Sequence, residues 1–152
     1  MHLFNFEADF VDSLRCIPMQ VRYKLDTCGI KLKLAEWHKF SQAQRTSLVN
    51  MPCTTATEVQ HYHHFLQDLV WECTGDRATE LAVETNPAWE DVLNIPASVQ
   101  AKLQEVGAEI ALEDWANLSH LERFVLIKLS RSNHENSNFV PALQEFNLLQ
   151  KS

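Results

Sequence analysis

Residues 17–48 read IPMQVRYKLDTCGIKLKLAEWHKFSQAQRTSL, and residues 95–126 read IPASVQAKLQEVGAEIALEDWANLSHLERFVL. The two stretches share the pattern I-P-x-x-V-x-x-K-L-x-x-x-G-x-x-x-x-L-x-x-W-x-x-x-S-x-x-x-R-x-x-L, at a constant offset of 78 residues and without a gap. Identities this dense in a single register indicate an internal duplication. The sequence therefore predicts one arrangement of helices that is built twice.

The first helix of each copy should begin at its Ile-Pro pair. Proline is well tolerated in the first turn, because its missing N–H would have no partner there. In the first copy Val21, Leu25 and Cys28 follow the i, i+4, i+7 spacing of an amphipathic helix, and a glycine that can end it follows at Gly29. The second copy repeats this order and ends at Gly107.

The next two helices of each copy are predicted by apolar spacing and by capping residues. A short helix should cover residues 34–40 and 112–118, with leucine, tryptophan, and phenylalanine or leucine at i, i+3, i+6 on its buried side. Ser-x-x-Gln at residues 41–44 and Ser-x-x-Glu at residues 119–122 have the composition of capping boxes. A third helix should begin at each of them.

The fourth helix is expected to differ between the copies. In the first copy Thr-x-x-Glu at residues 55–58 should cap a long helix that ends at Gly75. In the second copy, apolar residues within 139–146 repeat its buried face at an offset of 77, so one residue has been lost before them. Pro141 is compatible with this helix if Asn138 caps it, because the proline then lies in the first turn.

Two segments lie outside the repeats. Phe6, Phe10 and Leu14 have the i, i+4, i+8 spacing of an amphipathic helix that precedes the first copy. Residues 75–94 contain an Asn-Pro pair and five acidic residues against a single arginine, which predicts an irregular acidic connection on the surface. We expect Trp89 to hold this connection against the body of the protein.

These patterns predict an all-α fold in a single domain over residues 1–152. Its two pseudo-symmetric repeats, residues 17–74 and 95–149, should contain about four helices each and be joined by the connection at 75–94. The repeat is too long for the common helical solenoid units, and two copies are too few for a solenoid. We therefore expect the two halves to pack about a pseudo-two-fold axis.

Composition narrows the class of protein. The chain has 152 residues, 45% of them hydrophobic and 22% charged, and a net charge of −7, which is typical of a globular protein and opposes binding to nucleic acid. Three glycines leave no Gly-rich phosphate loop. No stretch has the length and apolarity of a membrane span, and the first residues resemble neither a secretory nor a transit peptide. We expect a cytoplasmic protein that binds neither nucleic acid nor membranes.

Two groups of side chains have the chemistry of metal or redox sites. His61, His64 and Asp68 share the polar face of the fourth helix at i, i+3, i+7, but an ordinary solvated face has the same pattern, and we favour that interpretation. The cysteines are widely spaced and form no C-x-x-C, which favours free and mostly buried thiols. We expect no metal and no cofactor. These cysteines are Cys16, Cys28, Cys53 and Cys73.

The two copies differ most at residues 128–138, where the second reads KLSRSNHENSN. A duplicated scaffold that diverges in one loop often carries its specific function there. Alternatively, Asn136 or Asn138 only caps the next helix and the charges are solvated. We expect no catalytic residue. The candidate binding residues are Arg123, Lys128, Arg131, His134, Glu135, Asn136 and Asn138.

Four motifs resemble one known family. They are FNFEADFVDSLRCIPM at residues 4–19, KLDTCGIKL at 24–32, NPAW at 86–89, and RFVLIKLSRSNHENSNFVPALQEF at 123–146. They span nearly the whole chain. Together they resemble the nitrate reductase-associated proteins, a family found mainly in cyanobacteria.

The resemblance implies a small cytosolic protein that an active assimilatory, ferredoxin-linked nitrate reductase requires, and not a reductase. We expect a non-catalytic accessory or maturation factor that docks on nitrate reductase through the candidate binding residues. An alternative is a small-ligand or molybdenum-cofactor-handling protein that uses residues 128–138. A third is a hydrolytic enzyme that uses His134 and Glu135.

Overall fold

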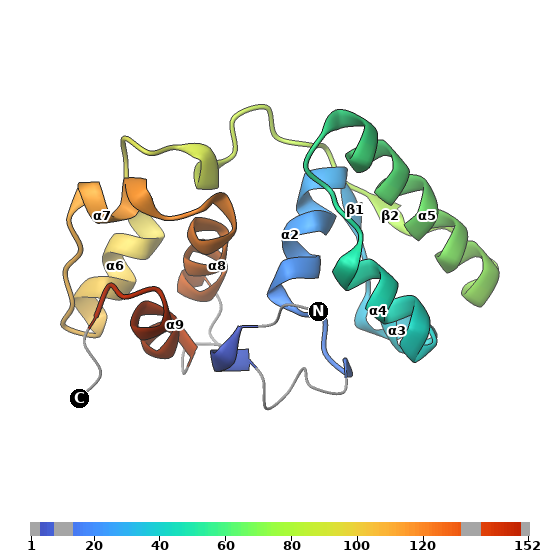
Figure 1. Ribbon diagram of the computed structural model, residues 1–152, viewed down its shortest axis with the longest axis horizontal. Helices are drawn as coiled ribbons and strands as arrows, with labels where there is room; N and C mark the ends of the chain where they lie inside the picture. The colour runs from blue at the N-terminus through green and yellow to red at the C-terminus, as the bar shows by residue number, and fades with distance from the viewer. Residues whose placement is uncertain (1–3, 8–13, 132–137, 150–152) are drawn as a thin grey trace. The chain divides into compact units, whose positions relative to one another are not determined.

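The computed structural model describes residues 4–7, 14–131 and 138–149 and is mainly helical, as the sequence predicts (Figure 1). The chain divides into two compact units, Met1–Val83 and Glu84–Ser152. Each predicted repeat falls within one unit, and the boundary between the units lies inside the predicted connection. The packing of the two halves about a two-fold axis stays a prediction.

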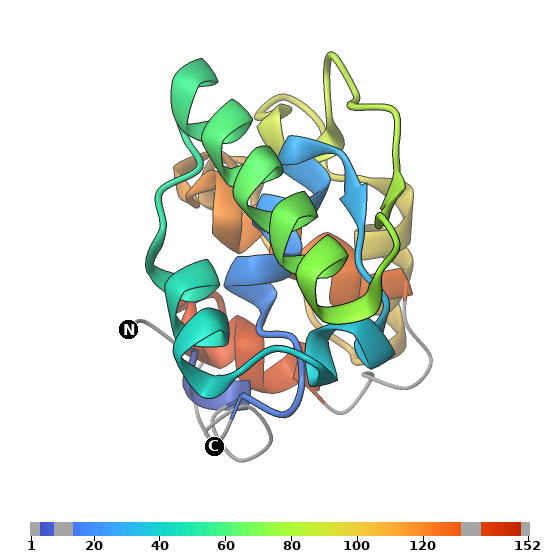
Figure 2. The same ribbon diagram turned by 90° about the vertical axis from the view of Figure 1, so that its right-hand side faces the viewer.

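Four helices form the described body of the first unit: α2 (Met19–Cys28), α3 (Leu34–His38), α4 (Gln42–Asn50) and α5 (Ala56–Thr74). Figure 2 shows α5 crossing over α2, against which it packs.

The segment before α2 differs from the helix that the phenylalanine spacing predicts. Asn5–Glu7 forms a short 3-10 helix, η1, and Leu14 has a φ of 57°, which is not helical. Residues 8–13, on which most of that helix would fall, lie outside the described residues. Glu7 is buried, and its carboxylate accepts the N–H of Met19 at 3.1 Å. It therefore stabilises the N-terminus of α2.

The helices of the first unit begin where their capping residues predict. The hydroxyl of Ser41 accepts the N–H of Gln44 at 3.1 Å, and the hydroxyl of Thr55 accepts the N–H of Glu58 at 3.2 Å. In both capping boxes the second side chain bonds back to the first backbone N–H. The predicted stop of α5 is also confirmed, because Gly75 has a φ of 78°.

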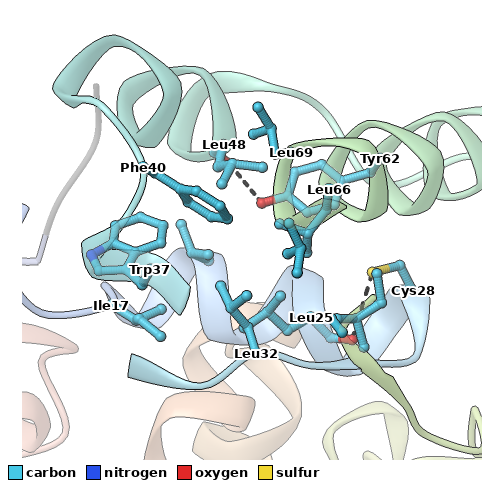
Figure 3. Close-up of a cluster of buried hydrophobic side chains, with 14 of the residues drawn as sticks. Ile17, Leu25, Cys28, Leu32, Trp37, Phe40, Leu48, Tyr62, Leu66 and Leu69 are labelled. Atoms are coloured by element: carbon cyan, nitrogen blue, oxygen red, sulfur yellow. Dashed lines mark hydrogen bonds between the residues drawn. The ribbon is translucent and has the colours of Figure 1, made fainter. Parts of the chain in front are cut away.

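The apolar faces of these helices meet in one core (Figure 3). Trp37 and Tyr62 are its largest fully buried side chains. The Tyr62 hydroxyl donates to the carbonyl of Leu48 at 2.8 Å, so burial leaves no polar atom of this ring unpaired. Other members labelled in Figure 3 are Ile17, Leu25, Cys28, Leu32, Phe40, Leu66 and Leu69.

A small antiparallel sheet, which the periodicity did not predict, completes the first unit. It pairs β1 (Ile30–Lys31) with β2 (Thr79–Glu80). Gln67 on α5 anchors the approach to β2, because its side-chain amide donates to the carbonyl of Ala78 at 3.0 Å and accepts the N–H of Ala78 at 2.9 Å. The first part of the predicted irregular connection is therefore held in place.

The described part of the second unit has four helices in the same order: α6 (Ala97–Glu105), α7 (Leu112–Asn117), α8 (His120–Arg131) and α9 (Phe139–Glu145). A 3-10 helix, η2 (Ala88–Glu90), precedes them. The apolar helix α8 packs against α6, α9 and η2. The core includes Val99, Leu103, Trp115, Phe124, Leu126 and Leu143.

The connection is pinned to the second unit, as expected. The ring of Trp89, in η2, meets the ring of Phe124 edge-on, with 5.2 Å between their centroids. Aromatic pairs of this geometry add to the stability gained from buried area.

One local prediction was wrong, and another holds only for the position of the residue. Leu34 and Leu112 are 49% and 46% exposed, although the i, i+3, i+6 spacing placed them on the buried side. At 3.6 residues per turn the first and seventh positions point about 120° apart, so the tryptophan and the seventh residue, Phe40 or Leu118, fill the core without the leucine. Asn138 precedes α9 but makes no side-chain capping bond. Pro141 does lie in the first turn, as predicted.

Candidate functional site

The candidate binding segment connects α8 to α9, and its described residues lie at its two ends. Lys128 is half-buried, with its ammonium 5.4 Å from the centroid of the Phe124 ring, within the range of a cation–π contact. Arg131 is exposed at the last residue of α8, and Asn138 is half-buried just before α9. His134, Glu135 and Asn136 lie outside the described residues.

The two units diverge in structure where their sequences diverge. Helix α4 has 9 residues, whereas α8 has 12. Ser130, which replaces the proline found at Pro52, donates its hydroxyl to the Ile127 carbonyl at 2.7 Å and lies 3.0 Å from the hydroxyl of Ser98 on α6. These contacts hold the end of α8. Ser130 was not among the predicted site residues, although the loss of a proline at this position was a usable signal.

Arg123 points into the second unit. Its side chain is 2% exposed. Its Nε donates to the carbonyl of Trp89 at 2.6 Å, and its Nη1 lies within bonding distance of the carbonyls of Trp115, Ala116 and Leu118. Arg123 therefore closes the C-terminal end of α7 and fixes η2, and it contributes no exposed group to the candidate surface.

The same contacts recur in the first unit. Arg45 donates to the carbonyls of Trp37 at 3.2 Å and His38 at 2.9 Å, at the end of α3. Each repeated tryptophan also donates its indole N–H to a carbonyl from the segment before its first helix: Trp37 to Leu14 at 2.8 Å, and Trp115 to Asp91 at 2.9 Å. The repeated tryptophan and arginine are therefore structural residues in both units.

The repeated lysine is used differently in the two units. Lys24 is buried, and its ammonium donates to the carbonyls of Val49 and Met51 at 2.6 Å each, at the end of α4. Burial lowers its pKa, partly offset by Cys53. Lys102 is equally buried, but its ammonium meets the carboxylate of Glu105 at 3.3 Å. The longer α8 thus coincides with a different bond for the lysine.

The structure does not assemble the candidate metal ligands. Among the described residues, no group of three or more histidine, cysteine, aspartate or glutamate side chains is placed to hold a metal ion. This holds for His61, His64 and Asp68 as well. Neighbouring His63 instead meets the carboxylate of Glu80 at 2.8 Å.

The four cysteines are free thiols. Burial raises the pKa of Cys28 to about 12 and that of Cys53 to about 11. Both are therefore protonated at neutral pH and behave as small apolar side chains.

The sequence pattern that defines the conserved nitrate reductase-associated proteins matches residues 3–146. The chain belongs to this family. No curated protein matches the chain, and no solved structure matches it. The match includes both units and the candidate segment, so the resemblance found in the four motifs is confirmed.

In this nitrate reductase-associated protein the described end of α8 offers one exposed cation, Arg131, beside the half-buried Lys128. Both lie in the last turn of α8. This arrangement suits recognition of carboxylates or backbone carbonyls on another molecule. No helix in the described ranges is both long and apolar enough to cross a bilayer.

Proposed function

We propose that this nitrate reductase-associated protein is a non-catalytic accessory or maturation factor of assimilatory ferredoxin-nitrate reductase. It acts in the cytoplasm, by docking on the enzyme. The observation that carries the proposal is the family match over residues 3–146, because the family is named for its association with nitrate reductase.

The use of buried polar groups supports a docking role over a catalytic one. The buried Arg123, Lys24 and Tyr62, and the partly exposed Arg45, all bond to backbone carbonyls and so serve the fold. Groups that act on another molecule must then come from the surface, where polar and charged side chains form the rim of protein interfaces.

The docking surface in this proposal is the segment at residues 128–138. Arg131 in this segment is an exposed cation, whereas the chain as a whole has a net charge of −7. A local cationic group on an acidic protein favours one orientation at encounter. We expect the contact on the reductase to be rich in carboxylates or backbone carbonyls.

Affinity capture from an extract of nitrate-grown cells tests the proposal. Tagged wild-type protein is compared with Arg131→Ala, and with a triple variant that carries His134→Ala, Glu135→Ala and Asn136→Ala. Lys39→Ala is the matched control, because Lys39 is also an exposed cation but lies in the first unit. Circular dichroism first establishes that each variant is folded, and the eluates are assayed for nitrate reductase activity.

Wild type and Lys39→Ala should retain the reductase, whereas Arg131→Ala and the triple variant should lose most of it. Equal retention by all four proteins would move the docking surface away from residues 128–138. If none of them retains the reductase, direct docking is refuted.

A further inference from the structure

The backbone just after the first helix of the first repeat pairs with a second strand, whereas no described strand pairs with the equivalent backbone of the second repeat. In the first unit it forms β1, whose Ile30 lies opposite Glu80 and whose Lys31 lies opposite Thr79 in β2. The N–H of Leu81 continues this pairing by donating to the carbonyl of Gly29 at 2.8 Å. The chain itself therefore supplies the second strand.

The corresponding residues of the second unit are Ala108 and Glu109, at the repeat offset of 78. Their burial alternates: Ala108 is buried, Glu109 exposed, Ile110 half-buried and Ala111 exposed. Such alternation is typical of an extended strand that covers a core with one face. Ala111 is extended, with a φ of −75° and a ψ of 151°.

No strand pairs with this segment within the described ranges, where β1 and β2 form the only sheet. In that part of the chain the backbone N–H groups of Glu109, Ile110 and Ala111 donate to no acceptor. Unpaired N–H and C=O groups along an exposed edge are a template for another strand.

The glycines that begin the two segments, Gly29 and Gly107, differ in how much space lies beside them. A Cβ on Gly29 would lie 2.8 Å from the carbonyl oxygen of Leu81 and 2.9 Å from Cγ2 of Val83. A Cβ on Gly107 would meet no atom of the described residues within 4 Å. The space that the strand and its continuation occupy beside Gly29 is therefore open beside Gly107.

Charge around the open edge defines what would fit there. Glu105, Glu109, Glu113 and Asp114 are all exposed. In the first unit the position of Glu109 is held by a cation, Lys31, which lies opposite Thr79, while Glu80 of the covering strand meets His63. The sign at the edge is reversed in the second unit, so the covering strand should carry lysine or arginine. Val106 and Leu112 add exposed apolar surface at 36% and 46%.

We propose that residues 107–111 form a strand-acceptor edge that binds an extended, basic segment of a partner protein. The segment pairs antiparallel, in the register that β2 has on β1, and main-chain hydrogen bonds supply the affinity while the surrounding carboxylates select the charge. This edge is separate from the segment at residues 128–138, and it exists whether or not nitrate reductase is the partner.

The chain provides a template for the test peptide. Residues 76–83 read DRATELAV and include β2. The probe is this octapeptide with Asp76→Lys and Glu80→Lys, blocked at both ends and fluorescently labelled. One control is the unchanged acidic peptide, and the other adds Thr79→Pro to the basic peptide, which removes a strand N–H. Binding to the full-length protein is measured by fluorescence anisotropy.

Two protein variants change the edge. Glu109→Lys reverses its charge, and Glu109→Pro removes its central N–H donor. Glu72→Lys is the matched control, since Glu72 is an exposed acid on α5 in the first unit. Circular dichroism establishes which variants are folded, and if Glu109→Pro is not, the charge exchange decides alone.

The basic peptide should bind wild type and Glu72→Lys at least about tenfold more tightly than either control peptide does, a difference of about 1.4 kcal/mol. Glu109→Lys should exchange this preference and bind the acidic peptide better. Equal binding of the basic peptide to wild type and to Glu109→Lys would overturn the proposal.

Two other occupants would also overturn it. Self-association that is seen by sedimentation in wild type and lost in Glu109→Lys would assign the edge to a second copy of the chain. Peptide binding that appears only after removal of residues 150–152 would assign it to the end of the same chain.

Discussion

Arg123→Ala should destabilise the second unit far more than Arg45→Ala destabilises the first. The two arginines occupy equivalent positions in the repeat and bond to carbonyls at the ends of equivalent short helices. They differ in burial, because Arg123 is 2% exposed whereas Arg45 is partly exposed. The pair therefore compares a buried with a partly exposed guanidinium, both bonded to the carbonyls of the repeated tryptophan and of the residue after it.

The size of the effect follows from the acceptors that each substitution leaves behind. Without Arg123, the carbonyls of Trp115 and Leu118 lose their guanidinium donor in a buried environment. The carbonyl of Trp115 keeps the N–H of Leu118 as a donor, so the Leu118 carbonyl is the buried acceptor left unpaired, at about 1–3 kcal/mol. The lost charged hydrogen bond to the Trp89 carbonyl adds about 1.5–3 kcal/mol, for a total of about 2.5–6 kcal/mol. The acceptors of Arg45 are only partly buried or exposed and can bond to water. Its loss should cost about 1–2 kcal/mol.

Urea unfolding followed by circular dichroism measures both values, with the free energy taken by linear extrapolation. Arg123→Lys is an informative third variant, because one ammonium keeps the charge but cannot replace the planar fork of donors. It should lie between wild type and Arg123→Ala. If Arg123→Ala costs less than about 1 kcal/mol, or no more than Arg45→Ala, then the buried carbonyls do not depend on the guanidinium and the reasoning fails.

Three further predictions concern the fold. Gly29→Ala should lower the free energy of unfolding by about 2–5 kcal/mol, since φ is +80° and the new Cβ would lie 2.8 Å from a backbone oxygen. Gly107→Ala, at a φ of +72° but with no described atom within 4 Å of the new Cβ, should cost only about 1–2 kcal/mol. Burial raises the pKa of Cys28 to about 12 and that of Cys53 to about 11. The stability that follows from these shifts is fully present below the usual thiol pKa of 9.0 and is lost as the pH rises above it. Trp37→Ala should cost about 3–5 kcal/mol, because the ring is fully buried.

Urea unfolding also tests these three. Equal losses for the two glycine variants would show that the contact with Leu81 adds no strain. The alkaline loss should appear between pH 9 and 11 and flatten when Cys28 and Cys53 are both replaced by alanine, and a stability that is constant over that range would contradict the pKa shifts. A loss below about 1 kcal/mol for Trp37→Ala would contradict its place in the core.

The parts of the fold that sequence predicted are those set by residues close together in the chain. The capping box at Ser41 and the stop at Gly75 depend on atoms within one helical turn, so composition and spacing suffice. The pairing of β1 with β2 joins residues 50 apart, Ile30 with Glu80, through two residues on each side. Strands this short have no periodicity to detect, and only the folded α5 brings them together.

The candidate site was predictable to a smaller extent. The exposure of Arg131 follows from its position in a polar segment, but the burial of Arg123 does not, since a charged residue usually lies on the surface. One signal was available: Arg123 recurs as Arg45 in exact register with the repeated tryptophans. A residue that both copies keep serves what both copies do, which is to form the same short helix and close its end.

Positions where the two copies differ are, by contrast, candidates for what one copy does alone. The second unit departs from the first at the end of α8, where the helix is longer, and at the segment after Gly107, where no described strand covers the backbone. Neither change is needed to build the helices, because both units contain them in the same order. In the first unit the chain covers its own strand edge and closes α4 with Lys24. Among its described residues the second unit makes neither the strand pairing nor the lysine contact, and these are the two surfaces through which we expect this nitrate reductase-associated protein to act.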